Sequence, residues 1–156
     1  MLIAVVKLVH VLAAVLFLGT GLGSAYYKLR AARSGQLAVI AWCDAEVVRA
    51  DWVFTVPAGL LVPATGLWLV ELYGMTLAVP WVWQGLLGYT VAGLTWLPAA
   101  ALQLRMRAAS AVALRDGAPL GPAWHRAQRI WMLLGVPSFA ATLAVVWMMV
   151  SKRALW

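Results

Sequence analysis

Charged residues are scarce in this chain. Only 11% of its 156 residues are Asp, Glu, Lys or Arg, whereas 65% are hydrophobic, and the mean hydropathy is +0.89. A soluble domain carries about 25% charged and roughly 45–50% apolar residues. One small globule cannot hide this much apolar surface from water. The composition therefore excludes an ordinary soluble domain and indicates an integral membrane protein.

Cysteine is nearly absent. The single Cys43 excludes an internal disulfide, and no cysteine cluster is present that could hold zinc or an iron–sulfur centre. The six methionines form no Met-x-x-Met ladder, which disfavours a copper relay. The sequence also lacks a nucleotide-binding glycine loop, a nucleophile elbow and an HExxH zinc motif. None of these common kinds of active site is expected.

Acidic residues are outnumbered, with five Asp and Glu against twelve Lys and Arg, for a net charge of +7. Such a charge would also suit nucleic acid, but nine of the twelve cations lie in two segments between apolar runs, 28–49 and 105–129. This clustering follows the positive-inside rule, so we expect no nucleic-acid partner. It places both basic segments in the cytoplasm and both termini in the periplasm or outside.

Long apolar runs are what the chain has in abundance. Each is close to the roughly 20 residues that cross a bilayer core. We expect an all-α polytopic protein: one four-helix membrane domain over residues 1–156, in the inner membrane of a bacterium. The predicted transmembrane helices are 2–27, 50–73, 81–104 and 130–150.

The segments between the runs also carry signals. A membrane-proximal helix is predicted over 36–50, after a helix stop at Gly35, and it continues into the second run. Glycines and prolines predict a partly irregular cytoplasmic loop over 105–129. Prolines inside the last three runs predict kinks, with the freed carbonyl groups satisfied by neighbouring helices or hydroxyl groups. These are Pro57, Pro63, Pro98 and Pro137.

The first run is the only one with two ionisable side chains well inside it, Lys7 and His10. At 100° per residue, one face of this helix also carries small residues and a phenylalanine. Ionisable groups are costly against lipid, so this face should look into the bundle or a cavity. Its members are Lys7, His10, Ala14, Phe17, Gly21 and Ser24. Gly19 and Gly23 form a GxxxG pair, which indicates tight packing within the chain or homodimerisation.

The other runs each carry a thin line of polar residues that should mark the bundle interior. His10 should lie about 12 Å from the outer end of its helix, at the level of Tyr89, Thr90, Thr65 and Thr142. Because an unpaired ammonium is costly at such depth, Lys7 is expected to pair with Glu71. The candidate interior polar residues are Asp51, Thr55, Thr65, Glu71, Gln84, Ser138 and Thr142. For Asp51, near the cytoplasmic boundary, a helix cap or an ion pair with Arg49 is the simplest role.

His10 has three candidate roles: a neutral core histidine with a hydrogen bond, a proton or metal-ion carrier, or an axial ligand of haem iron. His125 is expected about 25 Å away at the opposite boundary, so one haem cannot use both. Candidate groups opposite His10 are Tyr89, Lys7, a methionine, or His10 of a second subunit.

Several motifs then carry a resemblance over almost the whole chain. They are KxxHVLAA at 7–14, LGTGLGSA at 18–25, DWVFTxP at 51–57, PxTGLW at 63–68, WLP at 96–98 and LQLRMR at 102–107. Together they resemble a bacterial family of predicted integral membrane proteins of unknown function.

The start of the first helix is also similar, more distantly, to copper-resistance D proteins and to HemJ-type protoporphyrinogen oxidases. That resemblance implies haem b held by a histidine of the first helix, matched here by His10, and by a lysine of a later helix. The later runs contain no lysine before Lys152, so haem binding carries over and the oxidase activity does not. We therefore expect a small b-type haem or redox membrane protein, in a dimer or larger complex. The alternatives are a non-enzymatic accessory or assembly subunit, or a small permease built on Lys7, His10 and Glu71.

Overall fold

The computed structural model describes residues 1–156 and is entirely helical. In chain order the helices are α1 (Leu2–Ser34), α2 (Leu37–Ala50), the π-helical turn η1 (Asp51–Thr55), α3 (Val56–Leu72), α4 (Pro80–Asp116) and α5 (Pro122–Ser151). Because α2, η1 and α3 follow without a break, four continuous helical rods result. Each is long and apolar enough to cross a membrane. The predicted all-α fold with four such helices is confirmed.

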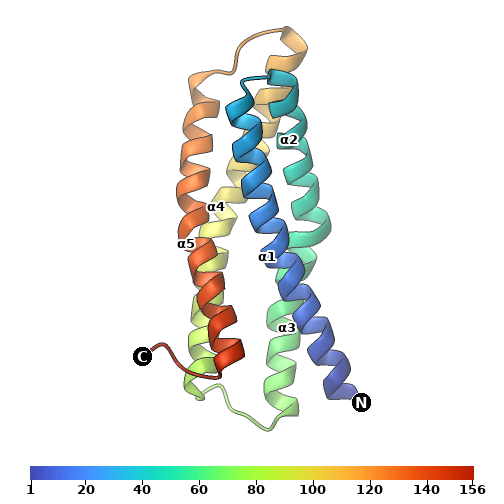
Figure 1. Cartoon of the computed structure of the whole chain (residues 1–156), viewed down its shortest axis with the longest axis vertical. Helices are drawn as coiled ribbons and strands as arrows, with labels where there is room; N and C mark the ends of the chain where they lie inside the picture. Colours follow the sequence, from blue (N-terminus) through green and yellow to red (C-terminus); the bar gives the residue numbers. More distant parts are fainter.

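The rods are longer than a bilayer core requires. They contain 30 to 37 residues, which at 1.5 Å per residue is about 45–55 Å, against roughly 30 Å of hydrocarbon. Each helix must therefore continue beyond the membrane. Nine of the twelve basic residues belong to the segments 28–49 and 105–129, around the loops 35–36 and 117–121. We call the end of the bundle that carries these loops the basic-loop end (Figure 1). The opposite end, with both chain termini, is the terminal end.

Glycine and proline set the helix ends. Gly35 follows α1 with a φ of 65°, and Gly117 follows α4 with a φ of 62°. This left-handed conformation suits glycine because it lacks a Cβ atom. The predicted stop at Gly35 is thus confirmed. The segment 105–129, predicted as a loop, is instead mostly helical, because residues 105–116 hold no glycine or proline and Pro122 starts α5 in the first turn.

The bundle is closed at one end and divided at the other. At the basic-loop end α1, α2, α4 and α5 surround a core of Ile40, Ala99, Met106, Trp124 and Trp131. Towards the terminal end α1 packs on α3 and α4 packs on α5, but α3 and α4 barely touch. Figure 1 shows the two pairs side by side, with α1 and α3 at the right and α4 and α5 at the left. Two cavities of the molecule lie between these pairs.

Two prolines shape the second rod. Pro63 has no N–H, so it leaves the Gly59 carbonyl without its helical donor, and the Tyr89 hydroxyl of α4 donates to that carbonyl. The prediction that a neighbouring group would satisfy a proline-freed carbonyl is confirmed here. Pro57 follows directly on η1, where the Val56 N–H reaches back five residues to the Asp51 carbonyl. The wider π turn makes room for a proline ring that would otherwise meet the preceding turn.

Candidate functional site

The polar face of α1 borders two cavities. Lys7 and His10 line one near the terminal end, which we call the terminal cavity. Phe17, Gly21 and Ser24 line a larger one nearer the basic-loop end, which we call the lateral cavity. Five of the six residues of the predicted face thus border a cavity, although Lys7 and Gly21 are also exposed.

The terminal cavity has a volume of about 230 Å³ and lies between the two helix pairs. Its walls are mainly apolar and aromatic, with Trp81, Tyr89 and Met149 among them. The imidazole of His10 enters from α1 and packs closely on α3. A Cβ atom added to Gly66 would lie 3.2 Å from His10 Cε1, so only glycine allows this approach without a shift. The Nδ1–Cε1 edge of the ring therefore faces α3.

Thr65 determines which nitrogen of His10 carries the proton. The Thr65 hydroxyl lies 2.5 Å from the Leu61 carbonyl oxygen and donates its only hydrogen there. His10 Nδ1, 2.9 Å from Thr65 Oγ1, must then be the donor in the second hydrogen bond. The neutral ring with its proton on Nδ1 keeps a lone pair on Nε2. This is the arrangement in which a histidine binds a metal through Nε2.

The charges at the terminal cavity are of one sign. Lys7 and Lys152 are its only charged lining residues, and neither forms an ion pair. The Lys152 ammonium lies 4.2 Å from the centre of the Trp81 ring. Its partial burial lowers the pKa of Lys152, and the positive charge of Lys7 lowers it further. The mouth of the cavity thus offers two cations without an anion.

The expected pair between Lys7 and Glu71 is wrong. Glu71 is exposed, makes no ion pair and does not border the terminal cavity. Lys7 is exposed as well, and a long ammonium side chain near a helix end can reach the membrane surface without a partner. The cluster of Lys7, His10 and Glu71 that would build a permease site therefore does not form.

Two other predicted residues have structural partners. Tyr89 borders the terminal cavity, but its hydroxyl is committed to the Gly59 carbonyl, which ties α4 to α3. Gln84, 2% exposed, binds the chain after α5 with both ends of its amide. It donates to the Trp156 carbonyl over 3.1 Å and accepts from the Leu155 N–H over 2.7 Å. This segment includes Lys152 and is held beside the terminal cavity.

The lateral cavity is larger, at about 420 Å³, and brings together four of the remaining predicted residues. Asp51 and Thr55 come from η1, and Ser138 and Thr142 come from α5. The Thr55 hydroxyl donates to Asp51 Oδ1 over 2.7 Å. Asp51 Oδ2 is buried without any hydrogen-bond partner, although the Gln103 amide lies in the same cavity wall. The expected pairing of Asp51 with Arg49 does not occur, because Arg49 is exposed and pairs with Glu46.

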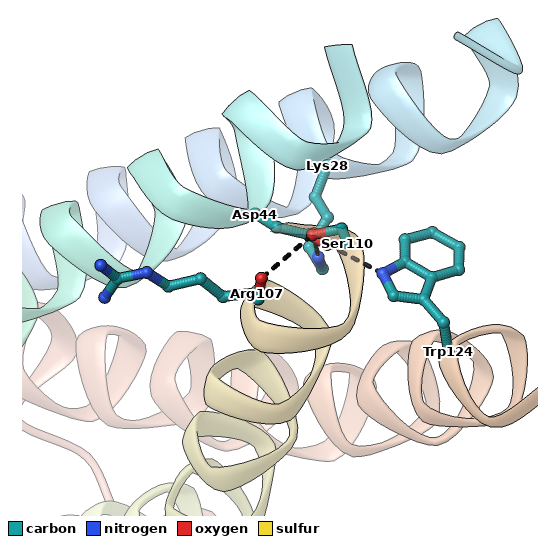
Figure 2. A network of polar contacts seen from close by, with 5 residues as sticks. All are labelled: Lys28, Asp44, Arg107, Ser110 and Trp124. Atoms are coloured by element: carbon teal, nitrogen blue, oxygen red, sulfur yellow. Dashed lines mark hydrogen bonds and ion pairs between the residues drawn. The ribbon is translucent and has the colours of Figure 1, made fainter. Parts of the chain in front are cut away.

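The most buried ionic contact joins Lys28 of α1 to Asp44 of α2, and sequence analysis missed it. Both side chains are only 2% exposed. Trp124 Nε1 donates to Asp44 Oδ2 over 2.8 Å (Figure 2). The Lys28 ammonium also lies 5.8 Å from the centre of the Trp124 ring. Each partner is thus satisfied, as a buried charge requires.

A signal for this pair was present in the sequence. Asp44 falls on the same face of α2 as Ile40 and Val47, an otherwise apolar face at spacings of four and three residues. A lone carboxylate there requires a buried cation. Lys28 looked like one of the loop cations because it directly follows the first apolar run. The pair closes the basic-loop end of the bundle.

The fold and these sites define a polytopic helical membrane protein with its polar groups gathered inside the bundle. Residues 4–153 match the family described as predicted integral membrane protein (DUF2269), and the chain belongs to this family. No curated protein and no solved structure matches it. The predicted resemblance to this family is confirmed.

Proposed function

We propose that this protein is a small b-type haem-binding membrane protein with His10 as an axial ligand of the iron. The observation that carries the proposal is the hydrogen bond of His10 Nδ1 with Thr65. It fixes the tautomer and orientation of the ring and leaves Nε2 for the metal. A neutral core histidine would make the same hydrogen bond, and the optical test below separates the two roles.

The surroundings of His10 suit haem b in two further respects. Apolar and aromatic walls suit the macrocycle, and Lys7 and Lys152 suit its two anionic propionate groups at the membrane surface. Met75 and Met149 also border the cavity and can supply a thioether opposite His10. The phenol of Tyr89 is less suitable, because it already binds Gly59. A second His10 from a partner subunit is the other candidate.

The volume of the terminal cavity sets a condition. At about 230 Å³ it is smaller than the roughly 300–1,000 Å³ of most cofactor sites. The macrocycle would require the pairs α1–α3 and α4–α5 to separate further, where they already touch little. Bound haem would supply one-electron redox chemistry, and the protein would bind it, orient it and shield it from water.

We further propose that the protein lies in the bacterial inner membrane with both termini outside, in a homodimer or a larger complex. The clustering of nine cations between the spans supports this orientation. His10 would then lie towards the outer side of the membrane. A complex fits the absence of any second histidine near His10, since His125 lies exposed at the start of α5.

The test is optical. The protein is expressed with ample haem, purified in mild detergent and examined by its reduced-minus-oxidised spectrum. We expect Soret and α bands in the wild type that disappear in His10→Ala. His125→Ala is the matched control, because it removes the other histidine far from the cavity and should keep the bands. A colourless wild-type protein would overturn the proposal and favour an accessory or assembly subunit.

A further inference from the structure

The lateral cavity contains the least satisfied polar group of the membrane region. Asp51 is 7% exposed, and its Oδ2 makes no well-aligned hydrogen bond, although the Gln103 side chain lies close to the carboxylate. A buried acceptor without a partner costs free energy, more so when it is charged. Gln128 Oε1 is the other such atom, but Gln128 does not border this cavity. Asp51 therefore combines an unused acceptor with a space beside it.

The backbone at Asp51 is unusual in the same place. Asp51 begins η1, the only π-helical turn of the chain. Such turns are rare inside helices and are frequent at functional sites. Here the turn places Asp51 and Thr55 together on the cavity wall. The Thr55 hydroxyl donates to Oδ1 and holds the carboxylate in place, so that Oδ2 is the oxygen without a well-aligned donor.

The remaining walls describe the kind of ligand. Aromatic surface comes from Phe17, Trp96, Trp131 and Phe139, and thirteen of the twenty-one lining residues are hydrophobic. Polar side chains, among them Gln103, Ser138 and Thr142, line much of the rest. Gly21 of α1 and Gly135 of α5 line the cavity and are also exposed. The cavity thus opens between α1 and α5 to the exterior of the bundle, which is lipid at this level. A ligand can enter from the membrane.

The depth of the carboxylate adds a further requirement. Asp51 follows the fourteen residues of α2, so it lies about 21 Å from the basic-loop end. That places it near the boundary of the hydrocarbon region, while Ser138, Phe139 and Leu143 line the cavity further inside. A molecule with a polar head at the boundary and an apolar tail in the bilayer matches this layout.

We propose that the lateral cavity binds a lipid-soluble hydroquinone, with a ring hydroxyl donating to Asp51 Oδ2. A flat ring suits the aromatic walls, its alkyl tail suits the opening to lipid, and its hydroxyl supplies the missing donor. A phospholipid acyl chain would fill the space but leave Oδ2 unsatisfied. The proposal uses none of the residues assigned to haem, so its test is independent of the test of the haem site.

The experiment is an anaerobic calorimetric titration of the protein in mild detergent with a decyl-substituted benzohydroquinone. The same compound with both hydroxyl groups methylated is the matched ligand, because it keeps the ring and tail and loses the donors. We expect the wild type to bind the hydroquinone at least about ten-fold more tightly than the methylated compound, as a hydrogen bond to a charged group predicts.

Two variants complete the design. Asp51→Asn should weaken hydroquinone binding about ten-fold and remove the preference over the methylated compound, whereas Asp116→Asn, at an exposed acid, should change neither. Gly135→Leu should abolish binding of both compounds by filling the mouth. Gly93→Leu is its control, because Gly93 has equally open space around its Cα and does not border the cavity.

Each result decides the proposal. Equal affinity of the wild type for the two compounds would overturn it and indicate simple filling by an apolar molecule. So would unchanged binding by Gly135→Leu, which places the ligand elsewhere. If Asp51→Asn fails to elute as a folded protein, the methylated compound and Gly135→Leu still give the answer.

Discussion

The Tyr89 hydroxyl of α4 donates a hydrogen bond to the Gly59 carbonyl of α3, and it is the only side-chain hydrogen bond that joins these two helices. The carbonyl is free because Pro63, four residues later, has no N–H to donate. The two helix pairs are therefore connected, at the level of the terminal cavity, through a carbonyl that a proline released.

This connection predicts the effect of Tyr89→Phe. The change keeps the ring and leaves the Gly59 carbonyl without a donor in an apolar interior, so we expect a loss of about 1–3 kcal/mol in the free energy of unfolding. Denaturant titration in mixed micelles would measure it. Tyr26→Phe is the control, because Tyr26 is exposed on α1 and makes no side-chain hydrogen bond. Equal stability of both variants would contradict this account.

The ion pair of Lys28 with Asp44 predicts a strongly non-additive result. Lys28→Met leaves a buried carboxylate and should cost about 3–5 kcal/mol. Adding Asp44→Asn removes the unpaired charge and keeps an acceptor for the Trp124 indole, so the double variant should recover much of the loss. Thermal unfolding in detergent would measure the wild type, Lys28→Met, Asp44→Asn and the double variant. Arg49→Met, which breaks the exposed pair with Glu46, should cost about 0–1 kcal/mol. Additive losses in the double variant would argue against the pair.

The packing of α4 on α5 predicts opposite outcomes at two glycines of α4. A Cβ atom at Gly88 would lie 2.8 Å from Val145 Cγ2, so Gly88→Ala should destabilise the protein by about 1–3 kcal/mol. Gly93 has no atom within 4 Å of the same position, and Gly93→Ala should be neutral or stabilise by about 0.5–1 kcal/mol. Unfolding midpoints of the two variants provide the comparison. A tolerated Gly88→Ala would mean that the two helices pack less closely than described.

Thr65 predicts a graded effect on haem, which depends on the proposed function. Thr65→Val keeps the shape of the side chain but removes the acceptor that orients His10. The affinity for haem should then fall about 10–100-fold, with the bands retained at high haem concentration. Spectroscopic titration of the haem-free protein measures this. Thr90→Val is the control, since the Thr90 hydroxyl is exposed and binds only its own helix at Leu86. An unchanged affinity would remove the role given to Thr65.

The predicted orientation can be tested separately. Alkaline phosphatase, active only outside the cytoplasm, should be active when fused after Trp156 and inactive when inserted at Gly117. Green fluorescent protein fused at the same positions should give the reverse pattern. Both results follow from the basic residues between the spans. The opposite pattern would place His10 towards the cytoplasm and invert the proposed topology.

Much of the architecture could be predicted because its causes are local. Apolar runs of membrane length predict four helices, and a glycine without a Cβ predicts the end of α1 at Gly35. The helical repeat alone placed His10, Phe17 and Ser24 on one face that borders the cavities. The continuation of α4 through 105–116 also has a local cause, because this segment contains no glycine or proline. The loop prediction was wrong there because it extended the effect of Gly117, Pro119, Gly121 and Pro122 to the residues before them.

The sites were harder, because each one depends on residues far apart in the chain. Depth in the bilayer placed Thr65 at the level of His10 together with Tyr89, Thr90 and Thr142, but only the structure shows that Thr65 is the partner. Lys7 and Glu71 were also expected at similar depth, but both are exposed and unpaired, because depth alone does not fix the face of a helix on which a residue lies. Lys28 and Asp44 required knowledge of how α1, α2 and α5 fold together.

By itself the sequence determined the membrane class, the helices and the interior face of α1, because hydropathy and helical period act on neighbouring residues. Only the tertiary structure decided that the bundle closes at Lys28 and Asp44 and divides at the terminal end. It also decided that Asp51 lies beside a cavity rather than beside Arg49. These outcomes depend on which side chains from different helices occupy the same space and bind the same partners. Residues far apart in the chain form these contacts, so no local sequence pattern predicts them.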